Sequence, residues 1–172
     1  GSGGSGVKKP TSLEELSKLQ YEGVVISKST APYETYEKYA KTLKLAFAPE
    51  FLRAVTAVQD YLASTFMIVG CESDEVFEMV KHAISVSKLP CKTFKRITIR
   101  EASLVKYFEN SFLATKVSLF NEFYLLTKAV GCNWEDVVEA LTMDPRIEND
   151  HTQVPGPDGK FGWGGHCFPK DT

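Results

Sequence analysis

The sequence predicts an α/β fold, in which part of a parallel sheet leads into a long helix and then an α-helical dimerisation domain. Three observations support this fold class. Short apolar runs at residues 23–27, 43–47 and 66–70 alternate with segments of helical periodicity, as in the strand–helix–strand units of a parallel sheet. A helical pattern then continues from Thr98 to Val130. The rest of the chain carries one further helical segment and a loop rich in glycine and proline.

The elements predicted before the long helix are short. Thr11 and Glu14 have the spacing of a capping box, and Leu13, Leu16 and Leu19 follow at helical spacing. The next expected elements are, in chain order, a buried parallel strand at 23–27, a helix at 33–42, a strand at 43–47, a loop and helix at 49–61, a strand at 66–70 and a helix at 73–84.

The longest predicted helix begins with a second capping box, formed by Thr98 and Glu101, and ends at Gly131. At about 1.5 Å per residue it is roughly 45 Å long. Its apolar residues cover most of its circumference, and such a helix is buried on more than one side. We therefore expect it at a junction between domains or subunits. Asn133 and Asp136 then open a further helix at 134–141.

Composition and charge exclude several classes of protein. The 172 residues are 43% hydrophobic and 24% charged, as in an ordinary globular chain. The formal net charge of −2 argues against nucleic acid as a partner. No apolar run approaches the roughly 20 residues that span a bilayer, so a membrane is not an expected partner either. Residues 1–6, GSGGSG, have the composition of a linker or tag.

The four cysteines stand far apart, at positions 71, 91, 132 and 167. Because none forms a Cys-x-x-Cys pair, we expect no metal site. A chain of this length has little need of disulfides, so reduced thiols and a cytoplasmic location are expected.

Cys167 is the main candidate for chemistry. It follows a glycine-rich loop and precedes Lys170 and Asp171. A nearby lysine lowers the pKa of a thiol, and the thiolate is the form that attacks a substrate. The alternative is an inert thiol beside a glycine-rich turn, and these residues alone leave both interpretations open.

Lys106 and Asn110 interrupt the apolar surface of the long helix. They are four residues apart and therefore share a face. Their spacing alone favours a surface lysine with its charge in water and an asparagine that bonds locally.

Five segments, taken in order, resemble the UDP-glucose/GDP-mannose dehydrogenase family. The resemblance covers residues 23–172 and rests on Lys28-Ser29-Thr30, Pro49-Glu50-Phe51-Leu52-Arg53, residues 106–116 (KYFENSFLATK), Asp144-Pro145-Arg146-Ile147 and residues 164–171 (GGHCFPKD). It implies a Rossmann-like sheet and a two-stage oxidation of UDP-glucose to UDP-glucuronate, with two NAD molecules as oxidant.

The resemblance also implies roles for individual residues. Cys167 would form a thiohemiacetal and then a thioester, with Lys106 and Asp171 handling protons and oxyanion charge. Asn110 would position the reacting oxygen, and Glu50 would assist thioester hydrolysis. The substrate-binding residues implied are Lys170, Arg146, Phe51 and Leu52, with Arg146 reaching across a homodimer built by the long helix; those near the cofactor are Thr30 and Lys170.

One part of the family's pattern is missing. A dinucleotide-binding fold needs a Gly-x-Gly-x-x-Gly turn after its first strand, and no predicted strand here is followed by one. We therefore divide the chain into a linker (1–6), the second half of an NAD-binding domain (7–98) and a central helical domain ending in the cysteine loop (99–172). Such a chain would be inactive alone.

Two alternatives remain at this stage. One is a non-catalytic dimerisation or scaffold module derived from the same family. The other is a cysteine-dependent acyl-transfer enzyme, which would need His82, His151 or His166 within reach of Cys167.

Overall fold

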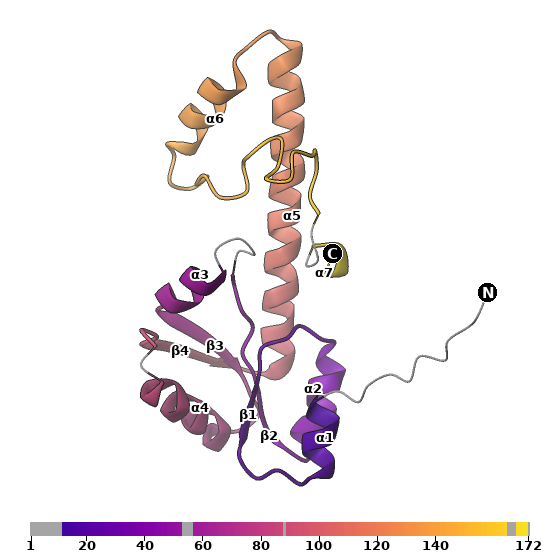
Figure 1. Ribbon diagram of the computed structural model, residues 1–172, viewed down its shortest axis with the longest axis vertical. Helices are drawn as coiled ribbons and strands as arrows, with labels where there is room; N and C mark the ends of the chain where they lie inside the picture. Colours follow the sequence, from indigo (N-terminus) through magenta and orange to yellow (C-terminus); the bar gives the residue numbers. More distant parts are fainter. Residues whose placement is uncertain (1–11, 53–56, 88, 165–167, 172) are drawn as a thin grey trace, which may run out of the picture. The chain divides into compact units, whose positions relative to one another are not determined.

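The computed structural model describes residues 12–52, 57–87, 89–164 and 168–171 (Figure 1). The chain forms two compact units that divide within the long helix, between Lys106 and Tyr107. The first unit is α/β and the second is helical, which confirms the predicted fold class.

The first unit is built on a four-stranded sheet of order β1-β2-β3-β4. β1 pairs in parallel with β2, and β3 in parallel with β4, whereas β2 and β3 are antiparallel and meet at Phe47 and Gly70. The expected parallel sheet is therefore correct for its two halves and wrong at their junction. The elements are α1 (Ser12–Lys18), β1 (Val24–Ser27), α2 (Tyr33–Ala40), β2 (Lys44–Phe47), α3 (Ala57–Ala63), β3 (Phe66–Gly70), α4 (Asp74–Val86) and β4 (Thr93–Ile97).

Strand β2 is buried on both faces of the sheet. Successive side chains of a strand point to opposite faces, and here Leu45 and Phe47 join one core while Ala46 joins another. The first core packs beneath α1 and α2, and the second beneath α4, with these helices on opposite sides of the sheet in Figure 1. β1 is only half-buried along its length, less than expected for its apolar run.

The long helix α5 (Ile99–Ala129) has the ends that the sequence predicts. The Thr98 N–H donates to Glu101 Oε2 at 2.7 Å, and the Glu101 N–H donates to Thr98 Oγ1 at 3.2 Å, which is a capping box. At the other end Gly131 has a φ of 75°, and the Cys132 N–H bonds to the Thr127 carbonyl at 3.0 Å. This left-handed turn is the usual glycine-dependent way to end a helix.

The second unit contains α5 from Tyr107 onward, α6 (Trp134–Thr142), a long loop and α7 (Phe168–Asp171). Its core contains Phe120, Trp134 and Val154. The Trp134 ring meets those of Phe120 and Tyr124 edge to face, with centroids 6.3 and 5.7 Å apart. The Asn133 side chain caps α6 by accepting the Glu135 N–H at 2.9 Å.

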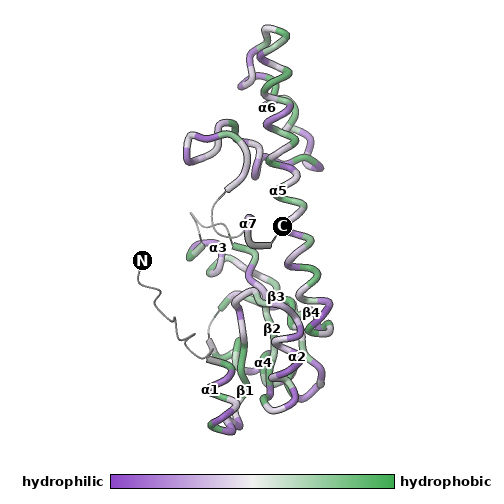
Figure 2. Tube along the Cα trace, turned by 90° about the vertical axis from the view of Figure 1, so that its right-hand side faces the viewer, coloured by the Kyte–Doolittle hydropathy of each residue, from purple (hydrophilic) through white to green (hydrophobic). Residues whose placement is uncertain are grey.

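Several apolar side chains of α5 are exposed. Figure 2 shows the hydrophobic residues along this helix in green. Phe108 and Phe112 are the most exposed of them, at 67% and 68% of their full areas. Single exposed apolar residues are common on protein surfaces, but contiguous exposed apolar patches are typical of surfaces that a partner covers. No helix within the described ranges has both the length and the apolar character needed to cross a membrane.

Candidate functional site

The parallel pairing of β1 and β2 brings two of the sequence motifs to the same edge of the sheet. Ser27 and Phe47 are register partners at the last positions of these strands. The Ala48 N–H extends the pairing by donating to the Ser27 carbonyl at 2.8 Å. Lys28-Ser29-Thr30 and Pro49–Leu52 therefore leave the sheet side by side, at the carboxyl ends of parallel strands where α/β folds bind ligands.

A charged pair joins these two segments. Lys28 Nζ lies 3.0 Å from Glu50 Oε1, and about a third of each side chain is exposed. The same ammonium lies 4.9 Å from the centre of the Tyr61 ring in α3. Thr30 is half-buried two residues after Lys28. Glu50 is thus held at the sheet edge by a cation, while it keeps access to water.

Lys106 from α5 reaches the same edge. Its Nζ lies 5.2 Å from the centre of the Phe51 ring, within the range of a cation–π contact. Phe51 itself stacks on Phe66 at the start of β3, with centroids 6.1 Å apart. The structure therefore brings Lys106 to the Pro49–Leu52 segment, in which Leu52 is half-buried. We call Lys28, Thr30, Glu50, Phe51 and Lys106 the sheet-edge cluster.

Asn110 lies one turn further along α5, in the second unit. Its side chain is buried, with only 4% of its area exposed. A buried amide is nearly always hydrogen-bonded. The burial of Asn110 therefore fits both an asparagine that bonds locally and one that orients a reacting oxygen.

Arg146 sits in an exposed turn of the second unit, in a tight ion pair with Asp144. Its Nη2 and Nε lie 2.5 and 3.1 Å from Asp144 Oδ2. The Arg146 guanidinium lowers the pKa of the Asp144 carboxyl, and the carboxylate raises the pKa of Arg146. Lys116 of α5 fastens the end of this turn by donating to the carbonyls of Ile147 and Glu148, at 2.7 and 3.2 Å.

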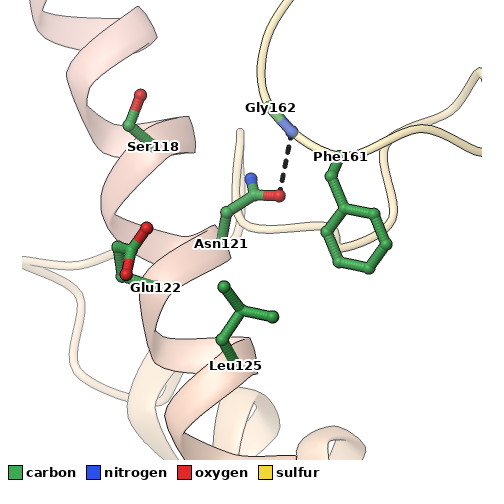
Figure 3. A pocket seen from close by; sticks show the side chains of 6 residues that line it. All are labelled: Ser118, Asn121, Glu122, Leu125, Phe161 and Gly162. Atoms are coloured by element: carbon green, nitrogen blue, oxygen red, sulfur yellow. Dashed lines mark hydrogen bonds between the residues drawn. The ribbon is translucent and has the colours of Figure 1, made fainter.

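The segment that leads toward Cys167 is bonded to α5. We call residues 159–164 the glycine loop. Its Gly162 N–H donates to Asn121 Oδ1 at 2.9 Å, and its Trp163 Nε1 donates to Ser118 Oγ at 3.0 Å. Figure 3 shows the first of these bonds at the rim of a shallow pocket of about 400 Å³, whose lining residues are Ser118, Asn121, Glu122, Leu125, Phe161 and Gly162.

Several residues that the sequence predicts for the site lack a full structural description. Cys167 and His166 lie outside the described residues, as does Arg53. Lys170 and Asp171 belong to α7, of which only the backbone is described at these two positions.

The described cysteines Cys71, Cys91 and Cys132 are free. Burial raises the pKa of the Cys71 and Cys91 thiols, which is the opposite of what a reactive thiolate needs. Among the residues that the structure describes, no group of three or more histidine, cysteine or acidic side chains is arranged to hold a metal ion.

The turn after β1 does not fit the pyrophosphate of a dinucleotide. Such a turn needs glycines so that backbone N–H groups approach the phosphates closely. Residues 28–32 contain no glycine, and α2 begins directly after Pro32, which has no N–H to donate. The sheet edge offers cationic and polar side chains instead.

Comparisons with known proteins now decide the family. Residues 100–172 match the central domain of the UDP-glucose/GDP-mannose dehydrogenase family. The chain is 35% identical over 132 residues to the UDP-glucose 6-dehydrogenase of Haloferax volcanii, covering 76% of this chain and 30% of that protein. It belongs to this family. It is 31% identical to the UDP-glucose 6-dehydrogenase of Bacillus subtilis, covering 90% and 36%.

Solved structures agree with the sequence matches. The UDP-glucose dehydrogenase of Pyrobaculum islandicum superposes with a TM-score of 0.68 at 32% identity, over 86% of this chain and 35% of that one. The UDP-D-ManNAc dehydrogenase of Pyrococcus horikoshii gives a TM-score of 0.72 at 27% identity, over 92% and 39%. The chain therefore spans about a third of the length of these relatives.

Ser118, Asn121 and Lys116 are residues that motif reasoning did not single out for a role. All three are polar side chains on a helix that carries many other polar and charged residues among its apolar ones. Nothing in the sequence therefore distinguishes them or indicates their partners.

Proposed function

We propose that this chain contributes the central part of an NAD-dependent dehydrogenase that oxidises UDP-glucose to UDP-glucuronate, and that it does not turn over alone. The single observation that carries the proposal is the sheet-edge cluster. Lys106 of α5 lies over Phe51, and the preceding residue, Glu50, pairs with Lys28. Residues from three separated motifs of the family thus converge on one edge.

The proposed chemistry assigns covalent catalysis to Cys167. Oxidation of a primary alcohol to a carboxylate removes four electrons, for which the parent enzyme uses two NAD molecules. Between the two oxidations the thiolate adds to the aldehyde carbon as a thiohemiacetal, and after the second oxidation water cleaves the thioester. Because residues 28–32 do not fit a pyrophosphate, we assign this chain no complete NAD site.

The side chains around that carbon would divide the remaining work. The Lys106 ammonium would stabilise the oxyanion that forms as sulfur adds to the carbonyl. Asn110 would orient the reacting oxygen, and Asp171 would exchange a proton with that oxygen. Glu50, held by Lys28 at 3.0 Å, would direct the water that hydrolyses the thioester, with Thr30 beside the reacting carbon.

The nucleotide end of the substrate would be bound by cationic side chains. Lys170 would lie close to the sugar and cofactor, and Phe51 and Leu52 would also bind the substrate. Arg146, 86% exposed in its side chain, would reach toward the nucleotide bound by the other subunit of a homodimer. We place the protein in the cytoplasm, with neither nucleic acid nor a membrane as partner.

Alkylation of the cysteines tests the proposal. The rate for each thiol is measured by peptide mass spectrometry against pH, with and without UDP-glucose, using Cys71, Cys91 and Cys132 as internal references. We expect Cys167 to react with an apparent pKa well below the roughly 8.5 of a free thiol, and UDP-glucose to slow its reaction only. A Cys167 that titrates like a free thiol and ignores the nucleotide sugar would contradict the proposal.

A second candidate function is a non-catalytic dimerisation module, and the exposed rings of Phe108 and Phe112 favour it. Both candidate functions require a dimer formed through α5. Measuring the molecular mass in solution tests whether this dimer exists. A Phe112→Glu variant should be monomeric, because dimerisation would bury its charge, whereas Val86→Glu on α4 should leave the mass unchanged. A dimer that does not bind UDP-glucose would favour the non-catalytic dimerisation module over the dehydrogenase function.

A further inference from the structure

Two side chains of α5 bond the glycine loop by the same arrangement. The Asn121 Nδ2 group donates to the Val117 carbonyl at 2.8 Å, and its Oδ1 accepts the Gly162 N–H at 2.9 Å. The Ser118 hydroxyl donates to the Ala114 carbonyl at 3.1 Å and accepts from Trp163 Nε1 at 3.0 Å. Each side chain uses its donor on its own helix and presents its acceptor to the loop.

This arrangement fixes the direction of each bond. Tryptophan Nε1 is only a donor, so Ser118 must accept from it, and its own hydrogen is then directed to the helix. Asn121 is the more buried of the two anchors, with only 9% of its area exposed, whereas Ser118 is exposed. Water competes less for a hydrogen bond in a buried position than for one at the surface.

Aromatic contacts hold the chain on both sides of residues 165–167. Trp163 meets Phe168 edge to face, with centroids 6.2 Å apart and planes at 84°. Phe161 packs in the same way on Tyr124 of α5, with centroids 5.5 Å apart. The segment before Cys167 is thereby attached to α5, and the residue after it is attached to that segment.

We infer that Asn121 and Ser118 are positioning residues that fix the glycine loop, and through it the chain that carries Cys167. This inference rests on the proposed function, in which Cys167 is the nucleophile. Gly162 has a φ of 77°, and glycine loses more conformational freedom on ordering than any other residue. A glycine-rich approach to a nucleophile therefore needs fastening, since small misplacements of a reacting group reduce rates strongly.

The first test is hydrogen exchange of the Gly162 amide in the full chain, measured by NMR. Replacing Asn121 by leucine removes the acceptor and keeps the volume, and we expect exchange to become about fivefold faster, as for loss of one neutral hydrogen bond. Asn121→Asp keeps an acceptor at the same place and should retain slow exchange. Thr115→Ala is the matched control, because the Thr115 hydroxyl also bonds four residues back, at 2.8 Å.

A double-mutant cycle isolates the second anchor. Ser118→Ala removes the acceptor, and Trp163→Phe removes the donor while it keeps an aromatic ring beside Phe168. If the two groups act through their hydrogen bond, exchange of the loop amides in the double variant will be no faster than in either single variant. Effects that simply multiply would overturn the role of Ser118.

The functional readout is the alkylation of Cys167 against pH. In Asn121→Leu we expect the apparent pKa to move toward the roughly 8.5 of a free thiol, with protection by UDP-glucose lost, while Thr115→Ala keeps the parental profile. Faster Gly162 exchange with an unchanged Cys167 profile would overturn the inference and leave the proposed function intact. If parental Cys167 already behaves as a free thiol, the proposed function fails, and the inferred role fails with it whatever the exchange of Gly162 shows.

Discussion

The two units place their candidate residues by different means. At the sheet edge, Lys28 and Glu50 meet because the strands before them, β1 and β2, are paired in parallel register. In the second unit, the turn of Arg146 and the glycine loop are each fastened by side chains of α5, Lys116 in one case and Asn121 in the other. Backbone pairing tolerates single side-chain changes, whereas a loop that is attached through a few side chains is sensitive to the loss of any of them.

The largest expected effect comes from breaking the core that supports the sheet edge. Phe47 is fully buried and stacks on Tyr36, with centroids 4.6 Å apart. Phe47→Ala should lower the free energy of unfolding of the first unit by about 3–5 kcal/mol, as for other buried aromatic residues. Urea denaturation followed by circular dichroism measures it, and Val86→Ala, at a 65% exposed position, should change it by less than about 0.5 kcal/mol. A loss below about 1 kcal/mol for Phe47→Ala would show that the edge does not depend on this core.

An intermediate effect is expected where one side chain fastens a loop. Lys116→Met keeps the aliphatic part of the side chain and removes the donor to the Ile147 and Glu148 carbonyls. Charged hydrogen bonds contribute about 1.5–3 kcal/mol when well buried, and because Lys116 is partly exposed we expect roughly 1 kcal/mol here. Amide exchange of residues 146–149 should quicken accordingly. Lys128→Met, on an exposed part of the same helix, is the matched control. If both variants changed stability and amide exchange equally, the proposed role of Lys116 in fastening this turn would be wrong.

The smallest expected effect is electrostatic and lies in the turn of Arg146. The guanidinium lowers the pKa of Asp144 below its model-compound value of 3.8. A carboxyl whose pKa is depressed in the folded state stabilises that state above the unfolded pKa, and the contribution disappears as pH falls through the folded value. Carboxyl chemical shifts should therefore show Asp144 titrating below pH 3.8, and Arg146→Gln should return the midpoint toward 3.8. Arg100→Gln in the first unit should leave it unchanged.

Local rules sufficed for most of the fold. The capping residues Thr98 and Glu101 and the glycine at 131 define the ends of α5 in the sequence and in the structure. β4 was not predicted, because Lys95 and Arg96 interrupt its apolar pattern at the edge of the sheet. The antiparallel junction of β2 and β3 was also missed, since the direction in which a strand returns depends on how the connection containing α3 crosses the sheet.

The candidate site also contains some contacts that the sequence predicts and others that it does not. Parallel strands place the residues that follow them at one edge, so the meeting of the Lys28 and Glu50 segments follows from the order of elements. The contact between Lys106 and Phe51 depends on where α5 leaves the sheet, and the bonds of Asn121 and Ser118 depend on the path of a long loop. Neither path has a periodic signal in the sequence, so only the resemblance to a family pointed to Lys106 and nothing pointed to Asn121.

The most direct test of the account asks whether Lys106 and Cys167 act on one centre. The measurement is the pH profile of Cys167 alkylation in Lys106→Met and in the control Lys128→Met. If both residues serve one centre, removing the Lys106 ammonium will raise the apparent pKa of Cys167, because a nearby cation stabilises the thiolate, and Lys128→Met will match the parent. Identical profiles in all three proteins would contradict the proposal that the sheet-edge cluster and the cysteine form one active site.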